Sequence, residues 1–252
     1  MGSFEKTAIV TGAARGIGLA TTKLFLERGI KVAMVDRDAD ELLVAARDLD
    51  QVLPLICDVS LADQVDGMLK EVIGWSGRVD VLVNNAGIAD FGPIEATEFA
   101  RWRRVMETNL DGVFMCSQAV LPELIKSKGN IVNIASISGL RASTLRVAYG
   151  SSKAAVIHLT KQQAAELGEH GVRANCVCPG PVRTKLAMAV HSQEIIDAYH
   201  DAIPLNRYGS EREIAEGIVF LASEQASYIT GQILAIDGGF ESTGVGLPAL
   251  RS

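Results

Sequence analysis

Seven short apolar runs, separated by longer stretches with helical spacing, constrain the fold of this chain more than any other feature of its sequence. The runs are Thr7–Val10, Val32–Val35, Leu53–Cys57, Val79–Val83, Ile131–Ile134, Val172–Val177 and Ile233–Ile236. They are continuously apolar rather than alternating, which is typical of parallel strands buried on both faces. Strands that alternate with helices form right-handed βαβ units. The sequence therefore predicts a doubly wound, Rossmann-type α/β fold with a seven-stranded parallel sheet between two layers of helices.

The stretches between these runs have the spacing of amphipathic helices. In the first, Ile17, Leu24 and Phe25 fall on one face, and Gly29 is placed to end the helix at its C′ position. The other strong helical stretches are Leu61–Trp75, Phe99–Lys126, Tyr149–Gly168 and Glu211–Ser223. No linker or repeat interrupts the pattern, so residues 1–252 are expected to form a single domain.

Composition and charge exclude several classes of protein. Hydrophobic residues make up 48% of the chain, which rules out intrinsic disorder. The net charge of −6 argues against a nucleic-acid partner, and no apolar run is long enough for a membrane span. The four cysteines and four histidines show no paired ligand spacing, so no metal site is expected. These features, with no apolar signal core at the N-terminus, predict a cytoplasmic protein.

A glycine-rich turn, T-G-A-A-R-G-I-G, joins the first predicted strand to the first predicted helix. Gly12 allows a tight turn, Gly16 allows the backbone to approach a phosphate, and Gly18 allows close packing of helix and strand. Asp36 ends the second strand eighteen residues after Gly18. A carboxylate there can accept both hydrogen bonds from an adenosine ribose diol, although most loop aspartates are simply solvated. The combination predicts a nucleotide site.

The segment Y-G-S-S-K opens a later helix and places Tyr149 and Lys153 one turn apart on the same face. This spacing alone often arises by chance. Its surroundings are more telling, because Ser136 ends the strand I-V-N-I-A-S thirteen residues before Tyr149. Ligands of open α/β sheets bind at the carboxyl ends of the strands. We therefore expect Ser136, Tyr149 and Lys153 to share one site.

Taken together, these motifs resemble the short-chain dehydrogenase/reductase family, in its single-domain branch. The matching segments, in order, are Thr11–Gly18, Asn84–Gly87 (N-N-A-G), Asn109, Ser136, Tyr149–Lys153, Pro179–Gly180 and Ile236–Gly239 (I-D-G-G). The resemblance covers essentially the whole chain, and no expected catalytic position departs from the family pattern. It implies hydride transfer between a carbinol carbon and a nicotinamide cofactor.

The resemblance also implies a role for each catalytic residue. Tyr149 would be the general acid and base, and Ser136 would hydrogen-bond the reacting oxygen, so that both contact the substrate. Lys153 would hold the nicotinamide ribose and, with the nicotinamide cation, lower the pKa of the Tyr149 phenol. Asn109 would hold a water that links Lys153 to solvent. Its alternative interpretation is a polar residue that kinks the long helix.

The cofactor residues implied by the family lie at the strand ends and in the loop after P-G. They are Gly12, Arg15, Gly16, Ile17, Gly18, Asp36, Arg37, Asp58, Val59, Asn85, Ala86, Gly87, Tyr149, Lys153, Pro179, Gly180, Val182 and Thr184. Asp36 would repel the 2′-phosphate of NADP, whereas Arg15 and Arg37 could pair with it. On balance NAD is predicted. A helix N-cap region for Asp58 and a plain turn for N-N-A-G are the alternatives without a cofactor.

The predicted activity is the interconversion of a secondary alcohol, such as a polyol or sugar alcohol, and its ketone. One alternative is a 3-oxoacyl thioester reductase, which shares every motif. Another is a catalytically idle dinucleotide-binding regulator. The family places a substrate lid at about residues 185–207, which include His191 and His200, and the C-terminal tail is residues 240–252. Arg141 and Arg146 are expected to face water rather than an anionic substrate.

Assembly and surface charge complete the predictions. The helices Phe99–Lys126 and Tyr149–Gly168 carry more apolar and small residues than one face against the sheet requires. Family members commonly pair these helices across a two-fold axis, which predicts a homotetramer, with a homodimer as the alternative. Leu247 and Leu250 of the tail are expected to cover a neighbouring subunit. Arg101, Arg103 and Arg104 form a basic cluster that is expected to be solvated rather than a carrier-protein docking patch.

Overall fold

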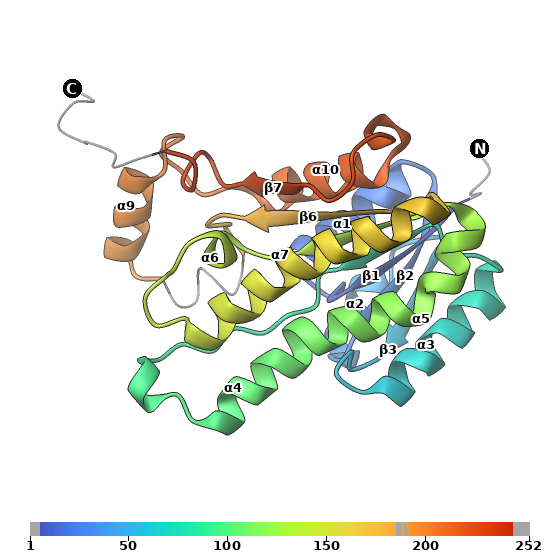
Figure 1. Ribbon diagram of the computed structural model, residues 1–252, viewed down its shortest axis with the longest axis horizontal. Coiled ribbons are helices and arrows are strands. Elements are labelled where there is room, and N and C mark those ends of the chain that lie inside the picture. Colours follow the sequence, from blue (N-terminus) through green and yellow to red (C-terminus); the bar gives the residue numbers. More distant parts are fainter. Residues whose placement is uncertain (1–5, 185–187, 189–190, 244–252) are drawn as a thin grey trace.

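The computed structural model describes residues 6–184, 188 and 191–243. Part of the expected lid and the end of the tail, with Leu247 and Leu250, lie outside these described residues. The described chain forms one seven-stranded parallel sheet with helices on both faces (Figure 1), which confirms the predicted fold class.

The strands follow the order β3-β2-β1-β4-β5-β6-β7 across the sheet. Their bounds are β1 Lys6–Thr11, β2 Ile30–Asp36, β3 Val52–Ile56, β4 Val81–Asn84, β5 Asn130–Ile134, β6 Arg173–Pro179 and β7 Ile233–Ile236. Each overlaps a predicted run. The strand order reverses between β1, which continues to β2, and β4, which continues to β5. A crevice therefore opens at the carboxyl ends of β1 and β4, where ligands bind in open α/β sheets.

The strands are apolar throughout because their side chains enter two cores in turn. In β1, Ala8 and Val10 pack into the core beneath α1 and α10, whereas Ile9 packs into the core beneath α3 and α5. Successive side chains of a strand point to opposite faces, so a sheet covered on both sides needs apolar residues at every position.

Helices α1, α2 and α10 cover one face of the sheet, and α3, α5 and α7 cover the other (Figure 1). The bounds are α1 Gly16–Glu27, α2 Ala39–Ala46, α3 Ala62–Ser76, α4 Phe99–Met106, α5 Gly112–Ser127, α6 Ile137–Leu140, α7 Val147–Leu167, α9 Gln193–Ala202 and α10 Glu211–Ala222. The predicted helix Phe99–Lys126 is divided into α4 and α5 by a π-helical turn at Glu107–Asp111.

The helical spacing did not indicate α2, α6 or α9, which are short or lie in loop regions. Each of them begins with a side-chain cap: Asp38 accepts a hydrogen bond from the Glu41 N–H at the start of α2, Ser136 accepts one from Ser138 at the start of α6, and Ser192 accepts one from Ile195 at the start of α9. Ser210 and Glu213 form a complete capping box at the start of α10, which the sequence did predict. Capping residues thus help to begin helices that are too short to be recognised from their apolar spacing.

Candidate active site

The glycine-rich turn has the close-packed geometry expected from its sequence. Gly12 and Gly16 adopt φ angles of +66° and +59°, a conformation that side chains with a Cβ rarely adopt. A Cβ on Gly18 would lie 2.1 Å from the Gly12 carbonyl oxygen, so only glycine fits where α1 meets the turn. Arg15, the N-cap residue of α1, makes no side-chain capping hydrogen bond. The turn therefore presents backbone N–H groups at a helix N-terminus, as a phosphate site requires.

Thr11 and Asn85 tie this turn to the loop after β4. The Thr11 hydroxyl accepts hydrogen bonds from the N–H groups of Asn85 and Ala86, each at 3.0 Å. The Asn85 side chain donates to the carbonyls of Thr11 and Gly12 at 2.9 and 3.1 Å. The N-N-A-G segment is therefore more than a plain turn, because it fixes the two sides of the crevice to each other. Thr11 was not among the predicted site residues, although it begins the glycine-rich motif.

A cavity of about 480 Å³, called here the turn cavity, extends from the glycine turn past the ends of β2 and β3. Asp36 projects into it, and its carboxylate accepts hydrogen bonds from the N–H groups of Ala14 and Asp38, each at 3.1 Å. These bonds hold the carboxylate beside the glycine turn. Of the residues predicted to bind the cofactor, Gly12, Arg15, Gly16, Ile17, Asp36, Arg37, Asp58, Val59, Asn85, Ala86, Gly87 and Thr184 line this cavity.

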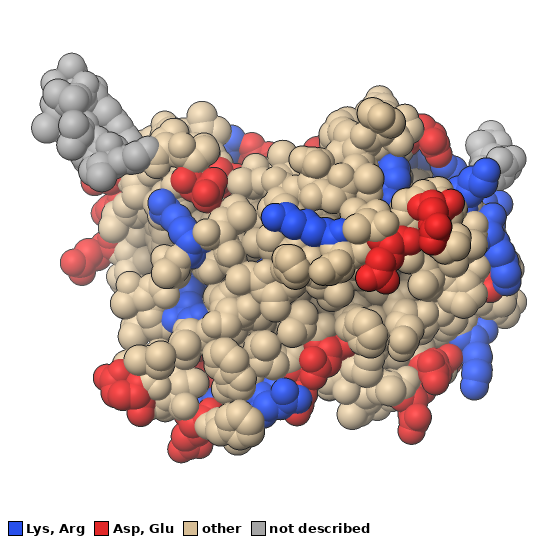
Figure 2. Space-filling view, in the orientation of Figure 1, with Lys and Arg blue, Asp and Glu red and all other residues tan. Residues whose placement is uncertain are grey.

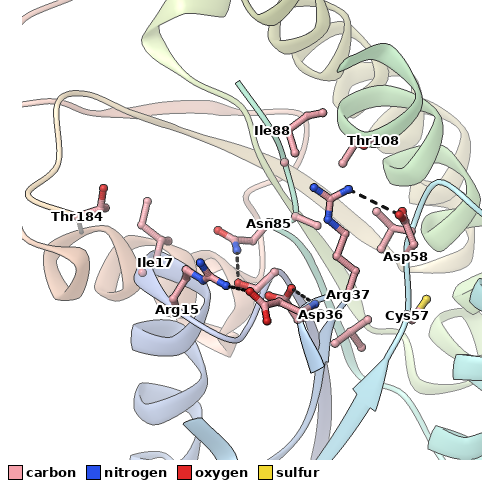
Figure 3. A pocket seen from close by; sticks show the side chains of 17 residues that line it. Arg15, Ile17, Asp36, Arg37, Cys57, Asp58, Asn85, Ile88, Thr108 and Thr184 are labelled. Carbon is pink, nitrogen blue, oxygen red and sulfur yellow. Dashed lines mark hydrogen bonds and ion pairs between the residues drawn. The ribbon is translucent and has the colours of Figure 1, made fainter. Parts of the chain in front are cut away.

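Both arginines of the turn cavity are paired with carboxylates (Figure 3). Arg15 forms an ion pair with Asp38, and Arg37 lies 3.6 Å from Asp58. Although partial burial raises the pKa of the Asp58 carboxyl, hydrogen bonds from Ser60 and the charge of Arg37 bring it below its ordinary value. The positive charge of this cavity is therefore balanced by its own acids. Asp38 was not among the predicted site residues.

A second cavity, of about 650 Å³, adjoins the first and is called here the tyrosine cavity. Both cavities are lined by Ile17, Asn85, Gly87, Ile88 and Thr184, so they form one continuous cleft. Ser136, Tyr149, Lys153, Pro179, Gly180 and Val182 line the tyrosine cavity, as the sequence predicted for one shared site. A Cβ on Gly180 would lie 2.6 Å from the Cβ of Asp237, so the P-G segment packs directly on the I-D-G-G segment.

Ser136, Tyr149 and Lys153 converge on one wall of the tyrosine cavity. Ser136 is the N-cap of α6, where its hydroxyl accepts a hydrogen bond from Ser138 N–H at 3.1 Å. The Ser136 hydroxyl also acts on the Tyr149 phenol, whose pKa it lowers. Lys153 is buried, and its Nζ donates to the Ile134 carbonyl at 2.7 Å and lies 5.8 Å from the centre of the Tyr149 ring. The three side chains therefore lie close together on this wall.

Burial dominates the titration of this wall. It raises the pKa of the Tyr149 phenol, against the lowering effects of the Ser136 hydrogen bond and the Arg146 charge. Burial also lowers the pKa of Lys153 to about 8. The Lys153 ammonium is held at the Ile134 carbonyl, and its expected effect on the Tyr149 pKa beside a bound nicotinamide cation stays a prediction. The cation that acts on the phenol is Arg146.

Asn109 occupies the π-helical turn between α4 and α5, which confirms the helix-distorting interpretation. Its side chain accepts a hydrogen bond from Ile88 N–H at 2.8 Å and donates to the Ile88 carbonyl at 2.9 Å. It also donates to Ser152 at 3.1 Å. Asn109 thus joins the loop after β4 to α7. The water that it was expected to hold stays a prediction.

Arg141 and Arg146, which were expected from the sequence to face water, both lie on the far wall of the tyrosine cavity. The Arg146 guanidinium lies 4.9 Å from the ring centre of Phe91 and 6.0 Å from that of Tyr149. Arg141 lies 4.0 Å from the ring centre of Phe240. Phe91 and Phe240 belong to none of the sequence motifs.

The described part of the expected lid closes the same cavity with aromatic side chains. His191 stacks on Tyr199, and its Nδ1 is 3.0 Å from the Tyr208 hydroxyl. Tyr199 also packs edge-on against Phe240. His191 and Tyr199 line the cavity, whereas His200 packs against Tyr208. His191 is therefore part of the wall of the tyrosine cavity.

Several other sequence features have structural partners. Arg101 and Arg104 pair with Asp90, and Arg103 pairs with Glu107 and Asp111, so the basic cluster is locally neutralised. All four cysteines are buried free thiols. Among the described residues, no group of three or more His, Cys, Asp or Glu side chains is arranged to hold a metal ion. Within the same part of the chain, no helix is both long and apolar enough to cross a membrane.

Comparison with known proteins gives a consistent result. A family model described as enoyl-(acyl carrier protein) reductase matches residues 12–241. The chain is 39% identical over 239 residues to a 3-oxoacyl-(acyl-carrier-protein) reductase of Thermotoga maritima, covering 93% of this chain and 97% of that one. It is 38% identical over 237 residues to a meso-2,3-butanediol dehydrogenase of Serratia marcescens, covering 93% and 94%.

Solved structures resemble the fold over almost the whole chain. A short-chain type dehydrogenase/reductase from Mycobacterium marinum matches with a TM-score of 0.90 and 36% identity, covering 96% of this chain and 98% of that one. A 3-ketoacyl-(acyl-carrier-protein) reductase from Brucella melitensis with NADH matches at 0.89 and 31%, covering 94% and 98%. A gluconate 5-dehydrogenase from Burkholderia cenocepacia with NADP and tartrate matches at 0.90 and 33%, covering 95% and 96%.

Proposed function

The chain belongs to the short-chain dehydrogenase/reductase family and is an oxidoreductase that acts on CH–OH groups, and from this premise we propose that it interconverts a secondary alcohol and its ketone with NAD(H). The observation that carries the proposal is the convergence of Ser136, Tyr149 and Lys153 on the wall of a cavity continuous with the glycine turn. A dinucleotide that lies along this cleft from the turn cavity to the tyrosine cavity reaches these side chains.

The residues of the cleft fit a dinucleotide by their geometry. The positive-φ glycines and the free helix N-terminus suit a pyrophosphate, and the Asp36 carboxylate suits a ribose diol beside it. Lys153 is positioned to donate to the nicotinamide ribose, and Val182 and Thr184 border the tyrosine cavity where the carboxamide is expected. When bound, the nicotinamide accepts or supplies the hydride.

In the oxidation direction, Tyr149 as phenolate takes the hydroxyl proton while the hydride leaves the carbinol carbon, and a C=O bond forms. Ser136 holds the reacting oxygen through its hydroxyl and orients it toward the phenol. The Lys153 charge is expected to act with that of the oxidised nicotinamide on the phenol. Asn109 is expected to hold the water that returns the proton to solvent, beside Lys153 and Gly87.

NAD is proposed over NADP because Asp36 occupies the position at which a 2′-phosphate would approach. Two like charges at about 4 Å repel by roughly 4 kcal/mol at an effective dielectric of about 20, before screening. Arg15 and Arg37 are the groups that could pair with the phosphate, but each is already paired with a carboxylate. The solved relatives differ in this respect, since one carries NADH and another NADP.

A 3-oxoacyl thioester reductase is the second candidate, favoured by the similarity to the Thermotoga maritima enzyme. The two candidates differ in the size of the substrate that they accept. Initial rates of reduced-nicotinamide oxidation should be compared for acetoin, for a sugar-acid ketone and for an acetoacetyl thioester on acyl carrier protein. Reduction of the small ketones supports the proposal. Turnover of the carrier-bound thioester alone would favour the reductase, and no turnover of any ketone would leave a dinucleotide-binding regulator.

We further propose a homotetramer, or otherwise a homodimer, built on α5 and α7. Phe114 of α5 is 50% exposed beside a groove lined by Leu121, Leu159 and Leu167. Figure 2 shows mostly uncharged surface over the middle of these two helices, with a few charged side chains over α7. A cytoplasmic location is proposed from the four reduced, buried cysteines. The substrate lid is proposed at about residues 185–207, of which α9 is a described part, with the tail at 240–252.

A further inference from the structure

The tyrosine cavity has an unbalanced charge. Three cationic side chains line it, Arg141, Arg146 and Lys153, and no aspartate or glutamate is among its described lining residues. Lys153 is directed at the Ile134 carbonyl and is used by the proposed chemistry. The two arginines are not used, so their presence in the wall needs a separate explanation.

Arg146 is held firmly at the place where a substrate must pass. It lies three residues before Tyr149 and is the N-cap residue of α7, where its carbonyl accepts a hydrogen bond from Gly150 N–H at 2.7 Å. The preceding carbonyl, of Leu145, accepts one from Gly92 N–H at 3.0 Å. Leu145 adopts φ +61°, which a leucine rarely adopts. The chain therefore fixes the Arg146 backbone beside the reacting wall at a conformational cost.

The Arg146 side chain has no counter-ion within the described part of the chain. Its guanidinium lies between the rings of Phe91 and Tyr149, and no carboxylate of the described chain lies within 4.0 Å of it or of Arg141. Cation–π contacts offset only part of the cost of removing a cation from water. Elsewhere in this cleft, Arg15 and Arg37 are each paired with an aspartate. The missing partner of Arg146 is therefore expected to come with the ligand.

The other titratable group of the lid does not compete for this role. Burial and the charge of Arg146 lower the pKa of His191, which also faces the Tyr208 hydroxyl at 3.0 Å. Both effects favour the neutral form of the imidazole. The positive field above the Ser136–Tyr149 wall comes from the guanidinium groups, and a guanidinium binds carboxylate and other oxoanions through paired N–H donors.

Resting on the proposed function, we propose that the substrate is a hydroxy acid and its oxo acid, with the anionic group within a few bonds of the reacting carbon. Arg146 binds the anionic group, and Arg141, held over Phe240 at the cavity mouth, adds a second and weaker contact. The anion can be a carboxylate, a phosphonate-type or a sulfonate group, because all present oxygens to the same fork of N–H donors.

Steady-state reduction with NADH tests this assignment directly. Acetoacetate, oxopropylphosphonate and oxopropylsulfonate identify the preferred anion, and acetoin is a neutral ketone of similar size. We expect Arg146→Gln to lower kcat/KM for the preferred acid by about thirtyfold, the usual range for a lost hydrogen bond to a charged group, and that for acetoin by less than about threefold. Arg141→Gln should lower the value for the acid by about threefold.

Controls separate ligand binding from effects on the phenol. Arg47→Gln removes the same charge from an exposed arginine at the end of α2, outside both cavities, and should change neither substrate. Arg146→Lys should recover part of the preference for the acid. Equal losses for the acid and for acetoin in Arg146→Gln would show that Arg146 acts only through Tyr149, and would overturn the proposal. So would a wild-type preference for acetoin.

Binding distinguishes this proposal from the proposed function. If wild type reduces no ketone, the proposed function fails, and calorimetry with malonate, methylphosphonate or methanesulfonate then decides the anion site. Binding of one of these anions to wild type that is weakened at least about tenfold in Arg146→Gln supports the site. Failure of all three to bind wild type overturns it. Circular dichroism of Arg146→Gln and Arg146→Lys confirms that both variants are folded.

Discussion

The turn cavity and the tyrosine cavity form one cleft, yet the arginines of the two cavities have different partners. In the turn cavity, Arg15 pairs with Asp38 and Arg37 pairs with Asp58. In the tyrosine cavity, Arg141 and Arg146 contact aromatic rings and have no described carboxylate partner. The first cavity is balanced within the protein and suits a ligand recognised by hydrogen bonds. The second leaves positive charge for the ligand to balance.

The two cavities also differ in how they are built. Strand ends and backbone hydrogen bonds shape the turn cavity, as in the bonds from Ala14 and Asp38 to Asp36 and from Asn85 to Thr11. Loops and the described part of the lid shape the tyrosine cavity, through Phe91, Tyr199 and Phe240. A frame of strand ends tolerates little variation, whereas loops can change their side chains without disturbing the sheet.

The largest expected effect separates the chemical step, measured by kcat, from the affinity for the cofactor. Tyr149→Phe should lower kcat by at least about a thousandfold, because the phenol hydroxyl alone exchanges the proton. Affinity for NADH, measured by fluorescence titration, should stay within about twofold, since the ring still packs and the turn cavity is untouched. The exposed Tyr228→Phe is the matched control. Retention of more than about a tenth of the wild-type turnover would remove Tyr149 from the proton-transfer role.

The next effect is confined to the turn cavity. Wild type should prefer NAD to NADP by at least about tenfold in kcat/KM, and Asp36→Ala should narrow or invert that ratio. The reason is that the Asp36 carboxylate repels a 2′-phosphate and accepts from a ribose diol. Asp40→Ala, at an exposed aspartate outside both cavities, should leave the ratio unchanged. If the ratio of kcat/KM with NAD to that with NADP is unchanged in Asp36→Ala, Asp36 does not discriminate between a ribose diol and a 2′-phosphate.

Lys153 lines the tyrosine cavity next to Gly87, which both cavities share, and its burial predicts a pH-dependent stability. The folded-state pKa is about 8 against an ordinary 10.5, so between these values the unfolded chain holds a proton that the folded protein has released. Stability of wild type relative to Lys153→Met should therefore rise across this window, by about 1 to 2 kcal/mol, and stay level below pH 8. Urea unfolding at neutral and alkaline pH measures it.

The matched control for this experiment is Lys161→Met, at an exposed lysine of α7. Its stability difference from wild type should not change over the same pH window. If the stability difference between Lys153→Met and wild type also stays constant with pH, the Lys153 ammonium is not disfavoured by burial in the folded protein.

The smallest expected effect tests whether the ion pair with Asp38 keeps Arg15 from binding a 2′-phosphate. Asp38→Asn removes the charge that pairs with Arg15 but keeps a side-chain oxygen for the α2 cap. Arg15 can then pair with a 2′-phosphate, so kcat/KM with NADP should rise about threefold while that with NAD changes little. If kcat/KM with NADP does not rise, the ion pair with Asp38 does not restrain Arg15.

Much of this molecule could be predicted from its sequence because the governing interactions are local or periodic. Continuous apolar runs indicated all seven strands, although the helices α2, α6 and α9, which depend on capping or tertiary position, were missed. Ser136 and Tyr149 could be placed together because parallel strands end at one edge of the sheet. The π-helical turn at Asn109 was foreseen only as a distortion, since its hydrogen bonds to Ile88 join segments far apart in the chain.

The sequence by itself determined the doubly wound sheet, the glycine turn and the Ser136–Tyr149–Lys153 wall, because strand periodicity, glycine conformation and helical spacing are properties of neighbouring residues. Only the tertiary structure decided which charges are balanced. No local pattern identifies the partner of Arg15 or of Arg146: Arg15 pairs with Asp38, whereas Arg146 contacts Phe91. Pairing of this kind depends on how loops from distant parts of the chain pack together, and no local pattern encodes that packing.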